Sequence, residues 1–228
     1  MMGESRWDFY GAGAGALAVV LFVAGAAVIG ERPAFDSTPA EVASQLGDER
    51  TRIQLGCALI AAAAPLLVWF LATVATLTRG SRPPARRAGA VVFGCGLAFV
   101  ALLMADVTAL AVAALRPENM TAVPELATAL RDFEFLAMGV AAPLVSGLLG
   151  ACAVLALRDE AIWPRWVGWL AALAGCAYAL RVGTLFTVEG AFAADGVLGL
   201  WVPVAAFASW IAVSSVMLAF NGPRQPVD

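Results

Sequence analysis

Residues 53–78 read IQLGCALIAAAAPLLVWFLATVATLT, a run of 26 residues without a charged side chain. About 20 apolar residues in a helix cross the hydrocarbon core of a bilayer, because each residue adds about 1.5 Å to the helix. Lipid offers no water to satisfy backbone N–H and C=O groups, so such a segment is stable there only as a helix. The run therefore predicts a transmembrane helix.

Five other stretches have the same character. The six predicted spans cover residues 9–29, 53–78, 88–115, 132–157, 166–187 and 197–220. Of the 228 residues, 61% are hydrophobic and 14% charged, whereas soluble domains carry about 25% charged residues. We therefore expect an all-α bundle of six transmembrane helices that forms one integral membrane domain over residues 1–228. The first apolar run exceeds the roughly 7–15 residues of a signal-peptide core, so we expect it to be a retained helix.

The amino-acid composition excludes several classes of cofactor and metal site. All 14 basic residues are arginine, and there is no histidine. A lysine Schiff base and a histidine-ligated haem, zinc or copper site are therefore excluded. The four cysteines, Cys57, Cys95, Cys152 and Cys176, lie singly in four different apolar stretches. We interpret them as small packing residues and expect no metal and no cofactor.

Arginines indicate how the helices are oriented. The termini and the loops at 79–87 and 158–165 would share one side of the membrane and hold eight arginines, whereas the opposite side holds five arginines and eleven acids. The positive-inside rule then predicts a multi-pass protein of the bacterial inner (plasma) membrane with both termini in the cytoplasm. We interpret the sequence RGSRPPARR at 79–87 as a topology signal that contacts anionic membrane lipids, not as a nucleic-acid site.

The first predicted outer loop contains a helix signal. Thr38 and Glu41 have the spacing of a capping box, with proline at the first helical position between them. Val42, Ala43 and Leu46 then give the segment one apolar side. We expect a short interfacial helix on the outer surface that can cover the bundle.

Two further patterns concern the bilayer and the oligomeric state. Trp163, Trp166 and Trp169 stand where the fifth span would leave the cytoplasmic headgroups, and we expect them to be interfacial anchors. The spacing of Gly11 and Gly15 fits a close helix–helix contact. Small residues occur throughout the chain, however, so the oligomeric state stays open.

Two charged residues lie within predicted spans. Asp106 lies about nine residues inside the outer end of the third span, and Arg181 about six residues inside that of the fifth. Each alone would cost about 2.5 to 3.5 kcal/mol on insertion scales. We expect the two side chains to approach within hydrogen-bonding distance, directly or through one water. Such a pair could serve a functional site or could only fix the register of the helices.

Helical phase extends this pair into a predicted chamber that opens outward. Tyr178, Arg181 and Thr184 recur every three residues, and Glu134 and Phe135 lie on the facing side of the fourth span. We expect helices three, four and five to enclose the chamber. Further charges gather at the outer helix ends, namely Arg52, Arg131, Asp132 and Glu189.

The chain resembles a family of uncharacterised multi-pass membrane proteins, common in high-GC bacteria and catalogued as a domain of unknown function. The resemblance is carried by the acidic segment at 37–52, the arginine-rich loop at 79–87 and the stretch LRD…WPRWVGW at 157–169. It covers most of the chain and implies the membrane topology, but no activity, cofactor or catalytic residue.

Three functions fit these residues. In the first, the chamber binds or translocates a small amphipathic or lipid-like ligand, with Arg181 meeting an anionic group and Phe99, Phe135 and Phe186 holding the apolar part. Tyr178 and Thr184 would then be neutral hydrogen-bonding groups.

In the second, the protein is a membrane-embedded enzyme, isomerase- or cyclase-like, in which Asp106 or Glu134 acts as a general acid on an isoprenoid or lipid and aromatic faces stabilise a developing cation. In the third, the protein is an accessory membrane subunit without a ligand, and its buried charges only hold helices together.

Overall fold

The computed structural model describes residues 4–30, 37–79, 82–158, 162–187, 190–193 and 196–221. Within these residues, six helices are long and apolar enough to cross a membrane, as the sequence predicts. The chain is therefore a multi-pass integral membrane protein with an all-α fold. Glu189, and Arg32 and Arg224 among the arginines counted for the orientation, lie outside the described residues.

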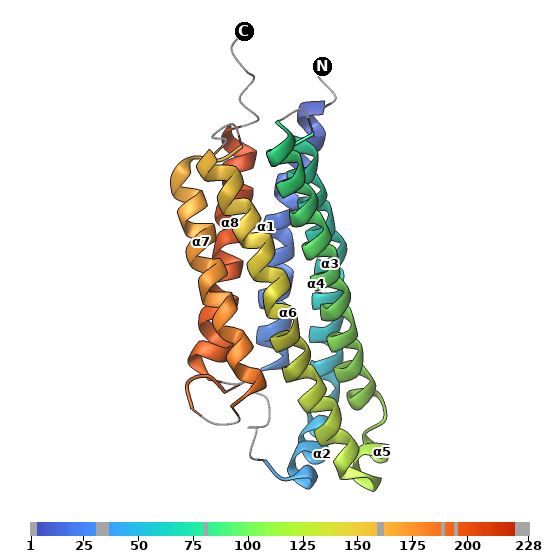
Figure 1. Ribbon diagram of the computed structural model, residues 1–228. Helices are drawn as coiled ribbons and strands as arrows, with labels where there is room; N and C mark the ends of the chain where they lie inside the picture. Colours follow the sequence, from blue (N-terminus) through green and yellow to red (C-terminus); the bar gives the residue numbers. More distant parts are fainter. Residues whose placement is uncertain are drawn as a thin grey trace.

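Each spanning segment extends beyond its predicted apolar stretch at one end at least, whereas the second and fifth spans end one and two residues before their predicted limits. The spanning elements are α1 (Glu4–Ile29), α3 (Arg50–Leu77), α4 (Pro83–Leu115), α6 (Pro124–Arg158), α7 (Arg165–Ala179) and α8 (Val202–Asn221). The fifth span changes from α7 into a 3-10 helix, η1 (Leu180–Leu185), and the sixth begins with a π-helical turn, η2 (Val197–Trp201), before α8. These two irregular turns lie at the same end of the bundle (Figure 1).

The six spans form a closed ring. Each packs against the next along the chain, α1 on α3, α3 on α4, α4 on α6, α6 on α7 and α7 on α8, and α8 returns to α1. All of them run roughly parallel or antiparallel to one another (Figure 1). A ring of six helices leaves an interior that every helix can reach.

Prolines set where several helices begin. Proline stands in the first turn of α4, and the short helix α5 (Pro117–Ala122) and α6 each start on one. A proline costs nothing there, because the first N–H groups of a helix have no intrahelical partner and the ring already holds a helical φ.

The short helix α2 (Pro39–Asp48) forms as expected, with both hydrogen bonds of its capping box in place. Its apolar residues Val42, Ala43 and Leu46 are buried and face the protein, because α2 packs on α5 and α6. The apolar side thus closes one end of the bundle and is not available to lipid. The start of α1 and the end of α8 lie at the opposite end (Figure 1).

Trp163 differs from the sequence expectation. Trp166 and Trp169 are 49% and 63% exposed, as interfacial anchors would be, but Trp163 is completely buried. Its indole packs edge-on against Trp210, with ring centroids 5.9 Å apart, and its Nε1–H donates to the carbonyl oxygen of Ser214 at 3.3 Å. The interfacial prediction for Trp163 was therefore wrong, because α8 offers this indole both a ring and a hydrogen-bond acceptor.

Gly11 and Gly15 lie in a close contact within the chain. A Cβ atom on Gly11 would collide with Thr73 of α3, and one on Gly15 would collide with Phe70 of α3 and Ser215 of α8. Their spacing therefore serves the packing of α1 inside the ring.

Candidate functional site

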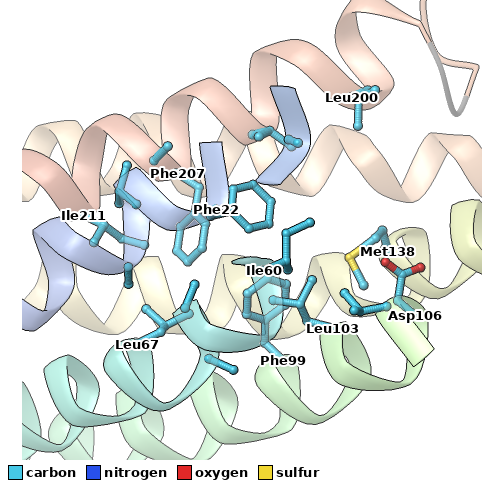
Figure 2. Close-up of a pocket in the computed structure, with 18 of the residues that line it drawn as sticks. Phe22, Ile60, Leu67, Phe99, Leu103, Asp106, Met138, Leu200, Phe207 and Ile211 are labelled. Atoms are coloured by element: carbon cyan, nitrogen blue, oxygen red, sulfur yellow. The ribbon is translucent and has the colours of Figure 1, made fainter. Parts of the chain in front are cut away.

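A cavity of about 110 Å³ lies inside the ring. Its wall includes residues of all six spans, so it is not enclosed only by the third, fourth and fifth spans, the helices expected to form the chamber. It extends from Leu67 and Ile211 at one end to Asp106, beside Met138, at the other (Figure 2). A cavity needs about 10 to 15 Å³ to hold one water molecule. This cavity therefore has room for a molecule larger than water.

Polar groups occur at one end of this cavity. Asp106 on α4, Tyr178 on α7 and Arg181 on η1 line it, whereas the remaining lining residues are apolar side chains and Cys57. Asp106 is 7% exposed, and Arg181 is 3% exposed. The cavity is therefore amphipathic along its length, with both of its charged side chains at the end nearer α2.

Arg181 is held close to the other two polar groups. Its guanidinium carbon lies 6.0 Å from the centre of the Tyr178 ring, and its charge interacts with that of Asp106. Its Nε is buried and has no hydrogen-bond partner among the described residues. Because a buried donor without an acceptor is costly, this atom is suited to an acceptor that enters the cavity. The direct hydrogen bond expected between Asp106 and Arg181 stays a prediction.

The 3-10 turn that carries Arg181 fits tightly against its neighbours. Thr184 is buried, and its hydroxyl donates to the carbonyl oxygen of Arg181 at 2.8 Å. A Cβ atom on Gly139 of α6 would lie 2.6 Å from the Thr184 hydroxyl, and one on Gly199 of η2 would lie 3.0 Å from the methyl carbon of Thr184. Glycine on both sides thus lets η1 approach α6 and η2 closely. This packing fixes the backbone from which Arg181 extends.

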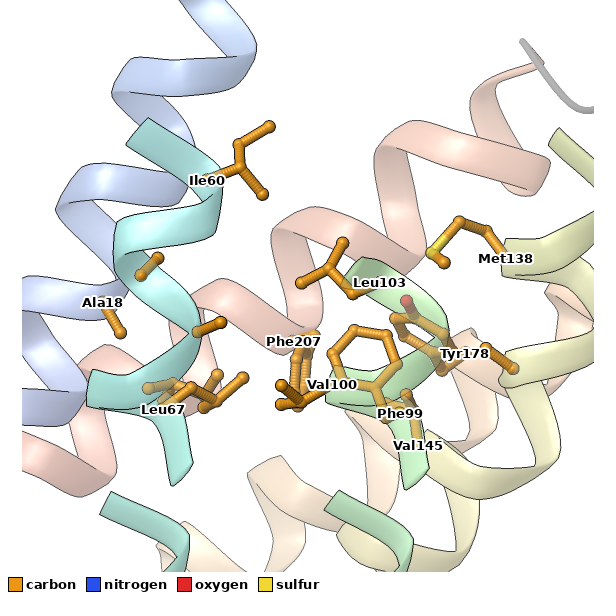
Figure 3. Close-up of a cluster of buried hydrophobic side chains, with 14 of the residues drawn as sticks. Ala18, Ile60, Leu67, Phe99, Val100, Leu103, Met138, Val145, Tyr178 and Phe207 are labelled. Atoms are coloured by element: carbon orange, nitrogen blue, oxygen red, sulfur yellow. The ribbon is translucent and has the colours of Figure 1, made fainter. Parts of the chain in front are cut away.

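Aromatic rings form the wall next to the polar end. Phe207 of α8 packs edge-on against both Phe99 of α4 and Tyr178 of α7, at centroid distances of 5.6 and 5.7 Å (Figure 3). Phe22 of α1 also lines the cavity (Figure 2). The sequence identified Phe99 but not Phe22 or Phe207, because an aromatic residue in an apolar helix carries no signal of which way it faces.

Glu134 belongs to a different cavity from Asp106. A smaller space of about 30 Å³ lies beneath α2 and is lined by Glu134 and Arg131 of α6. Arg131 also forms an ion pair with Asp132 at 3.0 Å. Ile29 and Leu110 line both cavities and so stand between them. The carboxyl groups that were expected to share one chamber thus lie in two neighbouring cavities.

Three of the predicted site residues line neither of these cavities. Phe135 and Thr184 are buried in packing, and Phe186 is 81% exposed. As for metals, the described residues include no group of three or more cysteine, aspartate or glutamate side chains placed to hold an ion.

Comparison of the chain with models of protein families, with curated proteins and with solved structures finds no match. The cavity, its aromatic wall and its charges are therefore the features from which the function can be inferred.

Proposed function

We propose that the protein binds or translocates a small amphipathic or lipid-like ligand in the larger cavity. The observation that carries this proposal is the polarity of the cavity, which is apolar from Leu67 to Phe99 and carries Asp106 and Arg181 at one end. An apolar chain would displace water from the first part, and burial of apolar surface stabilises by about 25 cal/mol per Å². Arg181 would meet an anionic group of the ligand, with Nε as one donor.

The proposed setting is the inner membrane of a bacterium, with both termini in the cytoplasm. The excess of arginine on the side of the termini supports this orientation. The polar end of the cavity would then face outward beneath α2, and the apolar end would lie toward the middle of the bilayer.

Binding of radiolabelled single-chain amphiphiles to the protein purified in dodecyl maltoside tests the proposal. Three probes with a C16 chain cover the headgroup charges, namely lysophosphatidylethanolamine, lysophosphatidylglycerol and hexadecylammonium. We expect saturable binding of at least one probe. Ala208→Leu, which fills the cavity from α8, should abolish it.

Ala205→Leu is the matched control, because Ala205 is on the same helix but exposed, and it should bind as the wild type does. Absence of saturable binding for all three probes would overturn the proposal and favour the accessory-subunit alternative. Undiminished binding by Ala208→Leu would exclude this cavity as the site.

An acid-catalytic enzyme is the second candidate. It is supported by the presence of a carboxyl group, Asp106, and the rings of Phe22, Phe99 and Phe207 in one cavity, since ring faces stabilise cations. In this alternative an isoprenoid would be converted by the wild type, and Asp106→Asn would still bind it while turnover falls by about 10² to 10⁴. Glu134, in the other cavity, is the less direct candidate for the acid.

A further inference from the structure

The charges that line the larger cavity balance one another. Arg181 contributes one positive and Asp106 one negative charge, and no other charged side chain of the described residues lines it. The charged side chains Arg131, Glu134 and Glu49 line the separate, smaller cavity across Ile29 and Leu110. A ligand therefore meets a polar end that carries both signs of charge and no net charge.

This balance of charge limits which ligand headgroups the cavity can bind. A purely anionic group would gain the attraction of Arg181, but it would bring an uncompensated negative charge close to Asp106, where burial leaves little water to screen it. A purely cationic group would have the opposite problem at Arg181. A headgroup with one charge of each sign keeps the buried site neutral and places an opposite charge beside each side chain.

The surroundings favour the same arrangement. The carboxylate of Asp106 and the guanidinium of Arg181 are both more than nine-tenths buried, so each is expected to interact strongly with a group that replaces water beside it. Arg181 also has the buried Nε donor without a partner among the described residues. A phosphate or carboxylate oxygen would satisfy that donor, and an ammonium group would donate to a carboxylate oxygen of Asp106.

We infer that the ligand, if the cavity binds one as proposed above, is a single-chain amphiphile with a zwitterionic headgroup, whose anionic part lies at Arg181 and whose ammonium part lies at Asp106. The apolar chain then runs along Phe99 and Phe207 toward Leu67.

Competition among the three C16 probes tests the inference. For the wild type we expect lysophosphatidylethanolamine to bind at least about tenfold more tightly than lysophosphatidylglycerol or hexadecylammonium, which corresponds to about 1.4 kcal/mol. Asp106→Asn leaves the arginine charge alone, so the anionic probe should become the tightest. Arg181→Gln leaves the carboxylate alone, so the cationic probe should become the tightest.

The ranking within each variant decides the matter, because it is independent of how much protein is folded. If one charge variant does not fold, the wild-type ranking and the other variant still decide. An anionic probe that binds the wild type as tightly as the zwitterionic one, or a ranking that neither substitution changes, would overturn the headgroup assignment while leaving the proposed function intact. Binding of none of the probes would instead overturn the proposed function itself.

Discussion

Gly13 and Gly15 lie two residues apart on α1 and have opposite surroundings. A Cβ atom on Gly15 would lie 2.6 Å from a ring carbon of Phe70 and would collide with the hydroxyl of Ser215, whereas one on Gly13 would meet nothing within 4 Å. Glycine also lowers helix stability by about 1 kcal/mol relative to alanine. The packing therefore requires glycine at position 15 for space, whereas it leaves room for a side chain at position 13.

Replacement by alanine should separate the two positions. We expect Gly15→Ala to destabilise the protein by about 1 to 3 kcal/mol, the usual range for overpacking, and so to lower its Tm in dodecyl maltoside. Gly13→Ala should leave the Tm unchanged or raise it, because the helix gains propensity without a collision. Equal effects of the two substitutions would show that α1 does not approach α3 and α8 as described.

Helix α2 is held by its first turn and by its buried side. The Thr38 N–H and hydroxyl each donate to Glu41 Oε2 at 2.8 Å, and the Glu41 N–H donates to the Thr38 hydroxyl oxygen at 3.4 Å. Hydrogen bonds from the backbone and side chain of Thr38 favour the carboxylate and lower the pKa of Glu41. The stabilisation is thus present above the ordinary pKa of a glutamate and is lost as the pH falls through the lowered pKa.

Acid should therefore loosen α2 before the rest of the bundle. In hydrogen-exchange measurements corrected for intrinsic rates, the protection of the α2 amides should fall as the pH drops below the ordinary range of glutamate. Glu41→Gln keeps the capping geometry and should remove this pH dependence. Thr38→Ala should reduce the protection at every pH, and Ser44→Ala, on the exposed side of α2, should not. A pH dependence that survives in Glu41→Gln would assign it to another group.

The fold of the bundle could be predicted because it depends on signals that lie within short stretches of the sequence. Runs such as residues 53–78 are too long and too apolar to be anything but spanning helices. The capping residues Thr38 and Glu41 likewise act through contacts within four residues. Trp163 could not be assigned this way, since its burial depends on Trp210 and Ser214, about 50 residues away.

The site was predictable mainly where polar side chains stand out from an apolar background. Asp106, Arg181 and Tyr178 could be named from helical phase and depth, and they line one cavity. Phe22 and Phe207 could not, because their role depends on the closure of the ring by α1 and α8. Glu134 was expected in the same chamber as Asp106, yet Ile29 and Leu110 stand between the two cavities. The helical phase of one span does not predict which side chains a neighbouring span places beside it.

The orientation of the bundle in the membrane can be tested with two introduced thiols. Helix α2 and the start of α4 belong to opposite ends of the bundle (Figure 1), and Ser44 and Pro84 are exposed at these two places. In a protein whose four cysteines are replaced by alanine, a membrane-impermeant maleimide added to intact cells should label Ser44→Cys. It should label Pro84→Cys only after the membrane is permeabilised, because the arginines beside Pro84 are expected to stay in the cytoplasm. The reverse pattern would place the polar end of the cavity toward the cytoplasm, and labelling of both thiols in intact cells would contradict the arrangement of the bundle itself.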